Sequence, residues 1–252
     1  MTAMSTGPQA FRWRLDGDPP PPLTDALHLG EAARAAVFRA AELRGLMPLP
    51  DAFHRGDAHE HAFWLAEDAD EDGRIDHLLV FAECGLPEPL IPVLAEGGRI
   101  FLGGRGAWRL APDWMGRRAP GALFGPARLW ISTTPFVTAR WQSRGQGEPL
   151  RPRDLPHNQL LQDISQRGLP APVWIGQENL ILRRGARPLA VEDFATQFRN
   201  GKANSRRPAD ATPCAVALRF AEPVWGPLAF GFGAHFGLGL FEPADDLSMD
   251  LA

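Results

Sequence analysis

Tyrosine is missing from the 252 residues of this chain, and lysine occurs only once, at Lys202. No tyrosine can therefore serve as an acid or a base, and Lys202 is the only side-chain amine that could act as a nucleophile. The two cysteines, Cys84 and Cys214, are too far apart in sequence to indicate a disulfide framework or a zinc ribbon. No apolar run approaches the ~20 residues of a membrane span, and Met1–Leu15 lacks the apolar core of a secretory signal. We therefore expect a soluble, cytoplasmic protein with no membrane partner.

The charge of the chain gives little sign of a nucleic-acid partner. Asp and Glu number 30 against 26 for Lys and Arg, so the net charge is −4 and the pI is near 6.0. Nucleic-acid binders usually carry a basic excess, and composition argues mildly against one here. The chain contains 26 Gly and 25 Pro residues, and this high content indicates many turns between short elements.

The first half of the chain has the strand and helix pattern of a ferredoxin-like fold. The expected strands are Phe11–Leu15, His61–Leu65, Ile75–Phe81, Arg99–Leu102 and Ala107–Leu110. A first helix is expected after Thr24 or Asp25, with alanines at helical spacing, and a second at Pro87–Glu96. The resulting order is β-α-β-β-α-β.

The second half is predicted to be a second α+β domain. Its expected elements are strands within Ala127–Trp141, a helix at Asp154–Arg167, a short helix at Ala190–Phe198, and strands at Ala215–Phe220 and Trp225–Phe230. The Gly-, Pro- and Arg-rich stretch Arg117–Gly125 is the expected linker. We therefore expect domains at residues 1–116 and 117–252.

The stretch Asp68–Asp76 resembles a calcium loop of the EF-hand type. Asp68, Asp70 and Asp72 fall at the first, third and fifth ligand positions, but Leu79 stands where a bidentate Glu is required. The alternative interpretation is a tight acidic turn between two antiparallel strands, with Asp72-Gly73 supplying a positive φ. The missing ligand favours the turn.

Three of the seven histidines are candidates for a site, namely His59, His61 and His77. His59 and His61 are two apart in an expected strand, so their side chains point to one face. If the chain turns at about Asp70, Phe63 lies opposite His77, which then shares that face. Converging imidazoles suit general acid–base catalysis near neutral pH or a zinc centre, and the sequence leaves both open.

Two segments near the C-terminus are candidates for binding an anion. Phe230–Phe241 contains Gly231, Gly233, Gly237 and Gly239, whose backbone N–H groups could approach a phosphate, although glycines in a terminal strand also mark bulges. The segment Arg199–Arg207, which includes Lys202, Arg206 and Arg207, is polar and basic. It is typical of a solvated loop, and also of a loop that contacts a phosphodiester backbone.

Four motifs in order resemble the CRISPR-associated fusion family of type I-U (also called I-G) systems, in which a Cas-five-like half precedes a Cas-six-like half. The motifs are Gly56–Trp64, Asp70–His77, Thr134-Pro-Phe-Val137 and Pro227–Phe241. The resemblance runs from about Ala26 to Pro243 and covers only the Cas-six-like half, which belongs to the RAMP superfamily.

This resemblance implies two tandem ferredoxin-like (RRM-like) domains with a glycine-rich loop near the C-terminus. It also implies binding of CRISPR repeat RNA and metal-independent cleavage of precursor CRISPR RNA, with no cofactor. The ribose 2′-oxygen would attack the adjacent phosphorus and leave a 2′,3′-cyclic phosphate. Catalytic histidines are expected after the first helix, at His59 and His61, with His77 in reserve. The residues expected to bind RNA are Lys202, Arg206, Arg207, Gly231, Gly233, His235, Gly237 and Gly239.

The same resemblance implies protein partners, which are the Cas-five-like and backbone subunits of a type I CRISPR effector complex. One alternative is a non-catalytic RNA-binding subunit of that complex. A second alternative, from outside the family, is a metal-dependent hydrolase that uses the histidines and Asp68–Asp76.

Overall fold

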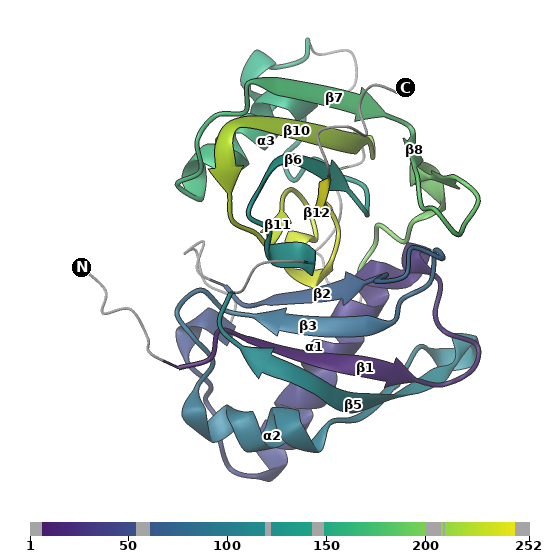
Figure 1. Ribbon diagram of the computed structural model, residues 1–252, viewed down its shortest axis with the longest axis vertical. Helices are drawn as coiled ribbons and strands as arrows, with labels where there is room; N and C mark the ends of the chain where they lie inside the picture. The colour runs from purple at the N-terminus through teal and green to yellow at the C-terminus, as the bar shows by residue number, and fades with distance from the viewer. Residues whose placement is uncertain are drawn as a thin grey trace. The chain divides into compact units, whose positions relative to one another are not determined.

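The computed structural model describes residues 7–53, 61–118, 122–142, 149–199, 208 and 210–244. These residues form two compact units, each with its own antiparallel sheet (Figure 1). Unit 1 contains the described residues up to Arg118 together with His235–Gly237, and unit 2 contains the others. Within these ranges, no helix is both long and apolar enough to cross a bilayer.

Unit 1 has the strand order of a ferredoxin-like fold. Its main elements are β1 (Ala10–Asp16), α1 (Ala26–Leu43), β2 (Phe63–Glu67), β3 (His77–Phe81), α2 (Ile91–Glu96), β4 (Gly98–Phe101) and β5 (Ala107–Gly116). The sheet runs β2-β3-β1-β5-β4, and every pairing is antiparallel. Strand β4 is an added edge strand that pairs only with β5. The predicted β-α-β-β-α-β order of the first half is confirmed.

Small residues on α1 allow close packing in unit 1. A Cβ added at Gly30 would lie 2.6 Å from the backbone oxygens of both Trp64 and Phe236, so only glycine fits there. The core is anchored by Trp13 on β1, which is fully buried. Its indole N–H donates to the carbonyl of Leu94 in α2 at 2.8 Å, which satisfies the one polar group of a large apolar side chain.

Unit 2 repeats the ferredoxin-like strand order with one helix replaced. Its main elements are β6 (Ala127–Ser132), α3 (Pro156–Gln166), β7 (Trp174–Glu178), the small hairpin β8 (Leu180–Ile181) and β9 (Leu189–Ala190), β10 (Ala215–Val224), β11 (Leu228–Ala229) and β12 (Leu240–Ala244). The sheet runs β11-β12-β6-β10-β7. A ferredoxin-like fold normally has its second helix between its last two strands. In this unit, β11 and the 3-10 turn Ala234–Phe236 lie there instead, between β10 and β12. The expected α+β class with two ferredoxin-like domains is confirmed.

The helix expected at Ala190–Phe198 is wrong. Ala190 ends β9, and only Val191–Asp193 form a single 3-10 turn. Val191 and Phe194 are both buried. These two apolar residues are three apart, and one tight turn buries the pair without continuing as a helix.

The hairpin of β2 and β3 is joined by the acidic turn, as expected, but its register was predicted wrongly. Phe63 pairs with Phe81, and His77 pairs with Glu67 at the other end of the strands. The turn therefore centres on Asp72 and not on Asp70. The observed register differs from the predicted one by an even number of residues, so Phe63 and His77 still share a face of the sheet. They are nevertheless separated by about 13 Å along the strand, at ~3.3 Å per residue.

Candidate active site

Two histidines from distant parts of the sequence lie side by side in unit 1. The ring centroids of His61 and His235 are 5.3 Å apart, and the planes meet edge to face at 81°. The His235 ring also stacks on Phe63, with centroids 4.5 Å apart. Both histidines are half-buried, and the Nδ1 atom of each is shielded from solvent.

Glycine places His235 beside His61. His235 lies in the 3-10 turn Ala234–Phe236, and Gly237 leaves this turn with a φ of +92°, which other residues rarely adopt. The backbone of Phe236 approaches α1 at Gly30, where any side chain would collide with the Phe236 carbonyl. These two glycines fix the backbone that directly follows the imidazole.

A backbone hydrogen bond also fixes the chain at His61, directly before β2 begins. The N–H of Ala62 donates to the carbonyl of Ala52 at 2.7 Å, one residue after His61. Ala62 and Phe63 are both buried. His61 thus precedes an anchored strand, and its ring is held next to that of His235. Two imidazoles at this separation can act as a base and an acid on one substrate, because histidine changes charge near neutral pH.

His77 belongs to a different set of contacts. Its Nε2 lies 3.9 Å from Asp113 Oδ2, and Asp113 also accepts from Arg12 Nε at 2.6 Å. Arg12 Nη1 contacts Glu67 at 3.3 Å. Burial alone would lower the pKa of Arg12, but the carboxylates of Glu67 and Asp113 outweigh it and raise that pKa. The expectation that His77 joins His61 in one pocket is wrong because of the register of β2 and β3.

Several residues expected at the site lie outside the described part of the chain. These are His59, Lys202, Arg206 and Arg207. Their proposed roles in catalysis and RNA binding stay predictions.

The glycine-rich segment uses some of its N–H groups internally. The N–H of Gly231 donates to Asp163 in α3 at 3.0 Å, and that of Gly239 donates to the Pro135 carbonyl at 2.9 Å. A Cβ at Gly239 would lie 2.0 Å from the Phe230 oxygen. Of the two interpretations of this segment, a structural one therefore suits Gly231 and Gly239. Gly233 has a φ of +74°, so it also serves a turn.

The acidic turn satisfies its carboxylates with its own backbone. Asp68 accepts from the N–H groups of Asp72 and Gly73, and Asp76 accepts from those of Ala69 and Asp70. Oxygens of Asp68, Asp70 and Asp76 lie within 4.8 Å of one another. These bonds explain the cluster as the closure of a hairpin loop.

We predict that replacing Asp70 and Asp72 together by Asn leaves any RNA cleavage within about threefold of wild type. Each asparagine keeps an oxygen that can accept the same loop N–H bonds, so the expected loss is under ~1 kcal/mol of transition-state stabilisation. Single-turnover cleavage rates test this. A hundredfold loss that added divalent ion restores would show that the turn is a metal site.

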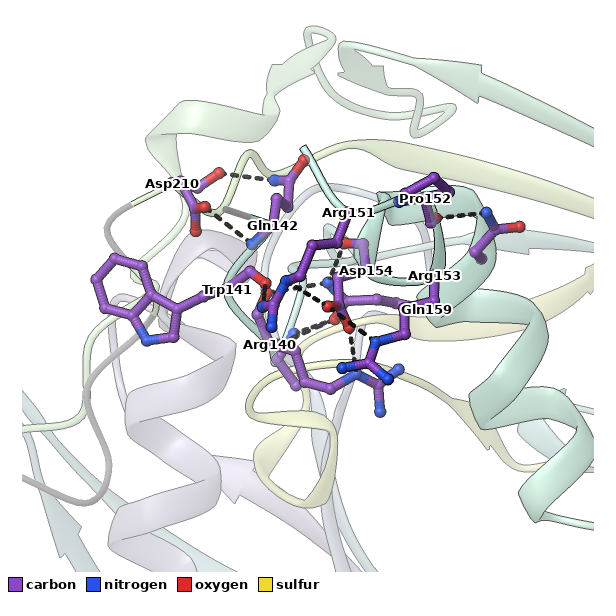
Figure 2. Close-up of polar contacts among 11 residues, drawn as sticks. Arg140, Trp141, Gln142, Arg151, Pro152, Arg153, Asp154, Gln159 and Asp210 are labelled. Carbon is purple, nitrogen blue, oxygen red and sulfur yellow. Dashed lines mark hydrogen bonds and ion pairs between the residues drawn. The ribbon is translucent and has the colours of Figure 1, made fainter. Parts of the chain in front are cut away.

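Unit 2 holds a cluster of arginines around one buried carboxylate (Figure 2). Arg140, Arg151 and Arg153 contact Asp154 through their Nε atoms at 3.5, 2.8 and 3.6 Å. Asp154 precedes α3 and is 4% exposed. We call these three arginines and Asp154 the arginine cluster.

Gln159 in α3 holds the two loops of the arginine cluster together. Its Oε1 accepts from the N–H groups of Ala139 and Arg140, and its Nε2 donates to the carbonyls of Arg140 and Asp154. Gln159 is 1% exposed. A fully hydrogen-bonded buried amide of this kind fixes the backbone that it contacts.

The strand order of both units defines the chain as a tandem ferredoxin-like protein. No protein-family model and no curated protein matches its sequence. The membership of the type I-U fusion family that its motifs suggest stays a prediction.

Several solved structures are similar to the chain over most of its length. One is a RAMP protein binding different RNA substrates, with 12% identity, a TM-score of 0.43, and coverage of 94% of this chain and 99% of that chain. A Cas6 product complex has 18% identity, a TM-score of 0.45, and coverage of 95% and 100%. A CRISPR associated protein Cas6 has 10% identity, a TM-score of 0.44, and coverage of 94% and 99%.

Sequence reasoning missed two features of the site. It assigned His235 to RNA binding and did not pair it with His61, because no local pattern shows which element the C-terminal segment contacts. It also missed the arginine cluster. Two sequence patterns were the available signal for this cluster. One is Arg151-Pro-Arg-Asp154, directly before an expected helix, and the other is the dipeptide Arg140-Trp141.

Proposed function

We propose that this protein binds CRISPR repeat RNA and cleaves precursor CRISPR RNA through attack of a ribose 2′-oxygen. The observation that carries the proposal is the contact between His61 and His235, with ring centroids 5.3 Å apart. It supports a nuclease because transesterification of RNA requires one group that accepts a proton and another that donates one. The motif resemblance independently favours RNA as the substrate.

In the proposed reaction, one imidazole removes the proton of the 2′-hydroxyl as its oxygen forms a bond to phosphorus. The bond from phosphorus to the 5′-oxygen breaks, and the second imidazole donates the proton that this oxygen takes up. The products are a 2′,3′-cyclic phosphate and a 5′-hydroxyl, and no water or metal enters the balance. Each proton transfer contributes roughly 10²–10⁴-fold to the rate.

We propose His61 and His235 as the catalytic pair, and His59 as a further candidate in the same segment as His61. His77 is not included, because the strand register separates it from Phe63. Lys202, Arg206 and Arg207 are proposed to contact the RNA backbone. The proposed protein partners are the Cas-five-like and backbone subunits of a type I effector complex.

Incubation of the purified protein with the cognate repeat RNA in excess EDTA tests the proposal. We expect cleavage in EDTA and a product that ends in a 2′,3′-cyclic phosphate. Tight binding without cleavage would replace the proposal by a non-catalytic RNA-binding subunit. Cleavage that EDTA abolishes and zinc or manganese restores would indicate a metal-dependent hydrolase.

A further inference from the structure

We propose that the arginine cluster of unit 2 is a binding site for the RNA phosphate backbone, with Trp141 as a stacking surface for a base. This inference rests on the proposed function and adds to it a contact site outside unit 1. The sequence motifs and the candidate active site do not include these residues.

The charge of the arginine cluster is unbalanced. Three guanidinium groups share the one carboxylate of Asp154, an excess of about +2 that is still about +1 when Asp210 is counted as well. Asp210, the other carboxylate in this region (Figure 2), accepts from the N–H of Gln142 at 2.9 Å. Like charges repel at such short range, and a single arginine would neutralise Asp154. A bound polyanion supplies the negative charge that this arrangement lacks.

The arginine cluster also keeps hydrogen-bond donors available. All three arginines contact Asp154 through Nε, so the terminal Nη groups are not used by the carboxylate. Among the described residues, Arg151 Nη2 donates to the Trp141 carbonyl, and Arg140 Nη2 is buried without a partner. The guanidinium of Arg153 is therefore the most accessible of the three. The side chain of Arg153 is 77% exposed. Guanidinium groups held in this way match the oxygens of a phosphate diester.

The arginine cluster is held in place before any ligand binds. Gln159 bonds the backbone at Ala139 and Arg140 to the backbone at Asp154, and the Asp154 carboxylate attracts the three guanidinium groups as ion pairs. Fixing these long side chains in advance reduces the conformational entropy that binding would otherwise cost. A surface lysine or arginine without such support would lack this advantage.

Trp141 gives the arginine cluster a second means of contacting RNA. It directly follows Arg140, and it is 53% exposed although tryptophan is a large apolar residue. Figure 2 shows its indole extending away from the guanidinium groups. An exposed aromatic next to cationic groups is the combination by which proteins bind single-stranded nucleic acid, because bases stack on the ring while phosphates contact the cations.

The test measures binding and not cleavage. The probe is repeat RNA with a 2′-deoxy residue at the cleavage position, titrated against the protein at several salt concentrations. We expect the double variant Arg140→Gln, Arg153→Gln to bind about tenfold more weakly or worse at moderate salt. Its plot of log affinity against log salt should be less steep by roughly 1.4, which corresponds to two contacts with single-stranded RNA.

Matched variants separate this site from general effects of charge and folding. Arg128→Gln removes a half-exposed arginine of unit 2 that pairs with Glu222, and it should leave the salt slope nearly unchanged. Arg153→Gln alone alters the most exposed member of the cluster, so it keeps the test valid if the double variant unfolds. Trp141→Ala should weaken binding about tenfold, and Trp141→Phe should restore most of it.

An unchanged affinity and salt slope in both arginine variants would overturn the inference. If the wild type binds RNA without cleaving it and the variants lose affinity, the inference holds and the proposed nuclease activity fails. If the wild type cleaves and the variants bind normally, only the inference fails. A wild type that binds no RNA overturns both.

Discussion

Replacing His61 or His235 by alanine is expected to slow cleavage of repeat RNA at least about a hundredfold, with little change in RNA affinity. Each imidazole is proposed to transfer one proton in the transition state, and the loss of a general acid or base typically reduces a rate by ~10²–10⁴-fold. Because the two rings act on one reaction, the double variant should be little slower than the worse single variant. Single-turnover rates at saturating protein measure this loss separately from binding.

His157→Ala is the matched control for these two variants. His157 is an exposed histidine near the start of α3, outside the candidate active site, and its removal should leave the cleavage rate unchanged. The Phe63 ring stacks on His235, so His235→Ala also removes packing, and thermal unfolding must show that each variant is folded. Wild-type cleavage by both folded histidine variants would place the active site elsewhere.

The fold of unit 1 could be predicted because its signals are local. The alternation in Phe11–Leu15 and the alanine spacing of the first helix each depend on a few neighbouring residues, and both elements are present as β1 and α1. Their order then leaves few possible topologies for the sheet. The same reasoning failed at Ala190–Phe198, where a pair of buried apolar residues is compatible with a helix or with one turn.

The register of the β2–β3 hairpin could not be predicted because it depends on the acidic turn. The turn is closed by hydrogen bonds that Asp68 and Asp76 accept from backbone N–H groups, and the pattern of those bonds is not evident from composition. Both strands are buried at nearly every position, so no alternation of apolar residues fixes their register, and the shared face was predicted correctly because the register is shifted by an even number of residues. The position along the strand was wrong, and that error placed His77 beside Phe63.

The pairing of His61 with His235 depends on tertiary structure alone. The glycine spacing after Phe230 indicates unusual backbone, but it does not indicate which element the segment contacts. Gly30 is the clearest partner, because its missing side chain admits the Phe236 carbonyl. A glycine inside a helix is unfavourable by itself, and its presence in α1 was a usable sign of close approach.

The most direct test of the proposed catalytic pair uses a repeat RNA whose leaving 5′-oxygen is replaced by sulfur. A thiolate leaves readily without protonation, so a variant that lacks only the general acid should regain the rate, whereas one that lacks the base should not. We predict that this substrate restores cleavage to within about tenfold of wild type in one of the two variants, His61→Ala or His235→Ala, and leaves the other at least about a hundredfold slower. Rescue of both variants, or of neither, would contradict the division of acid and base between His61 and His235.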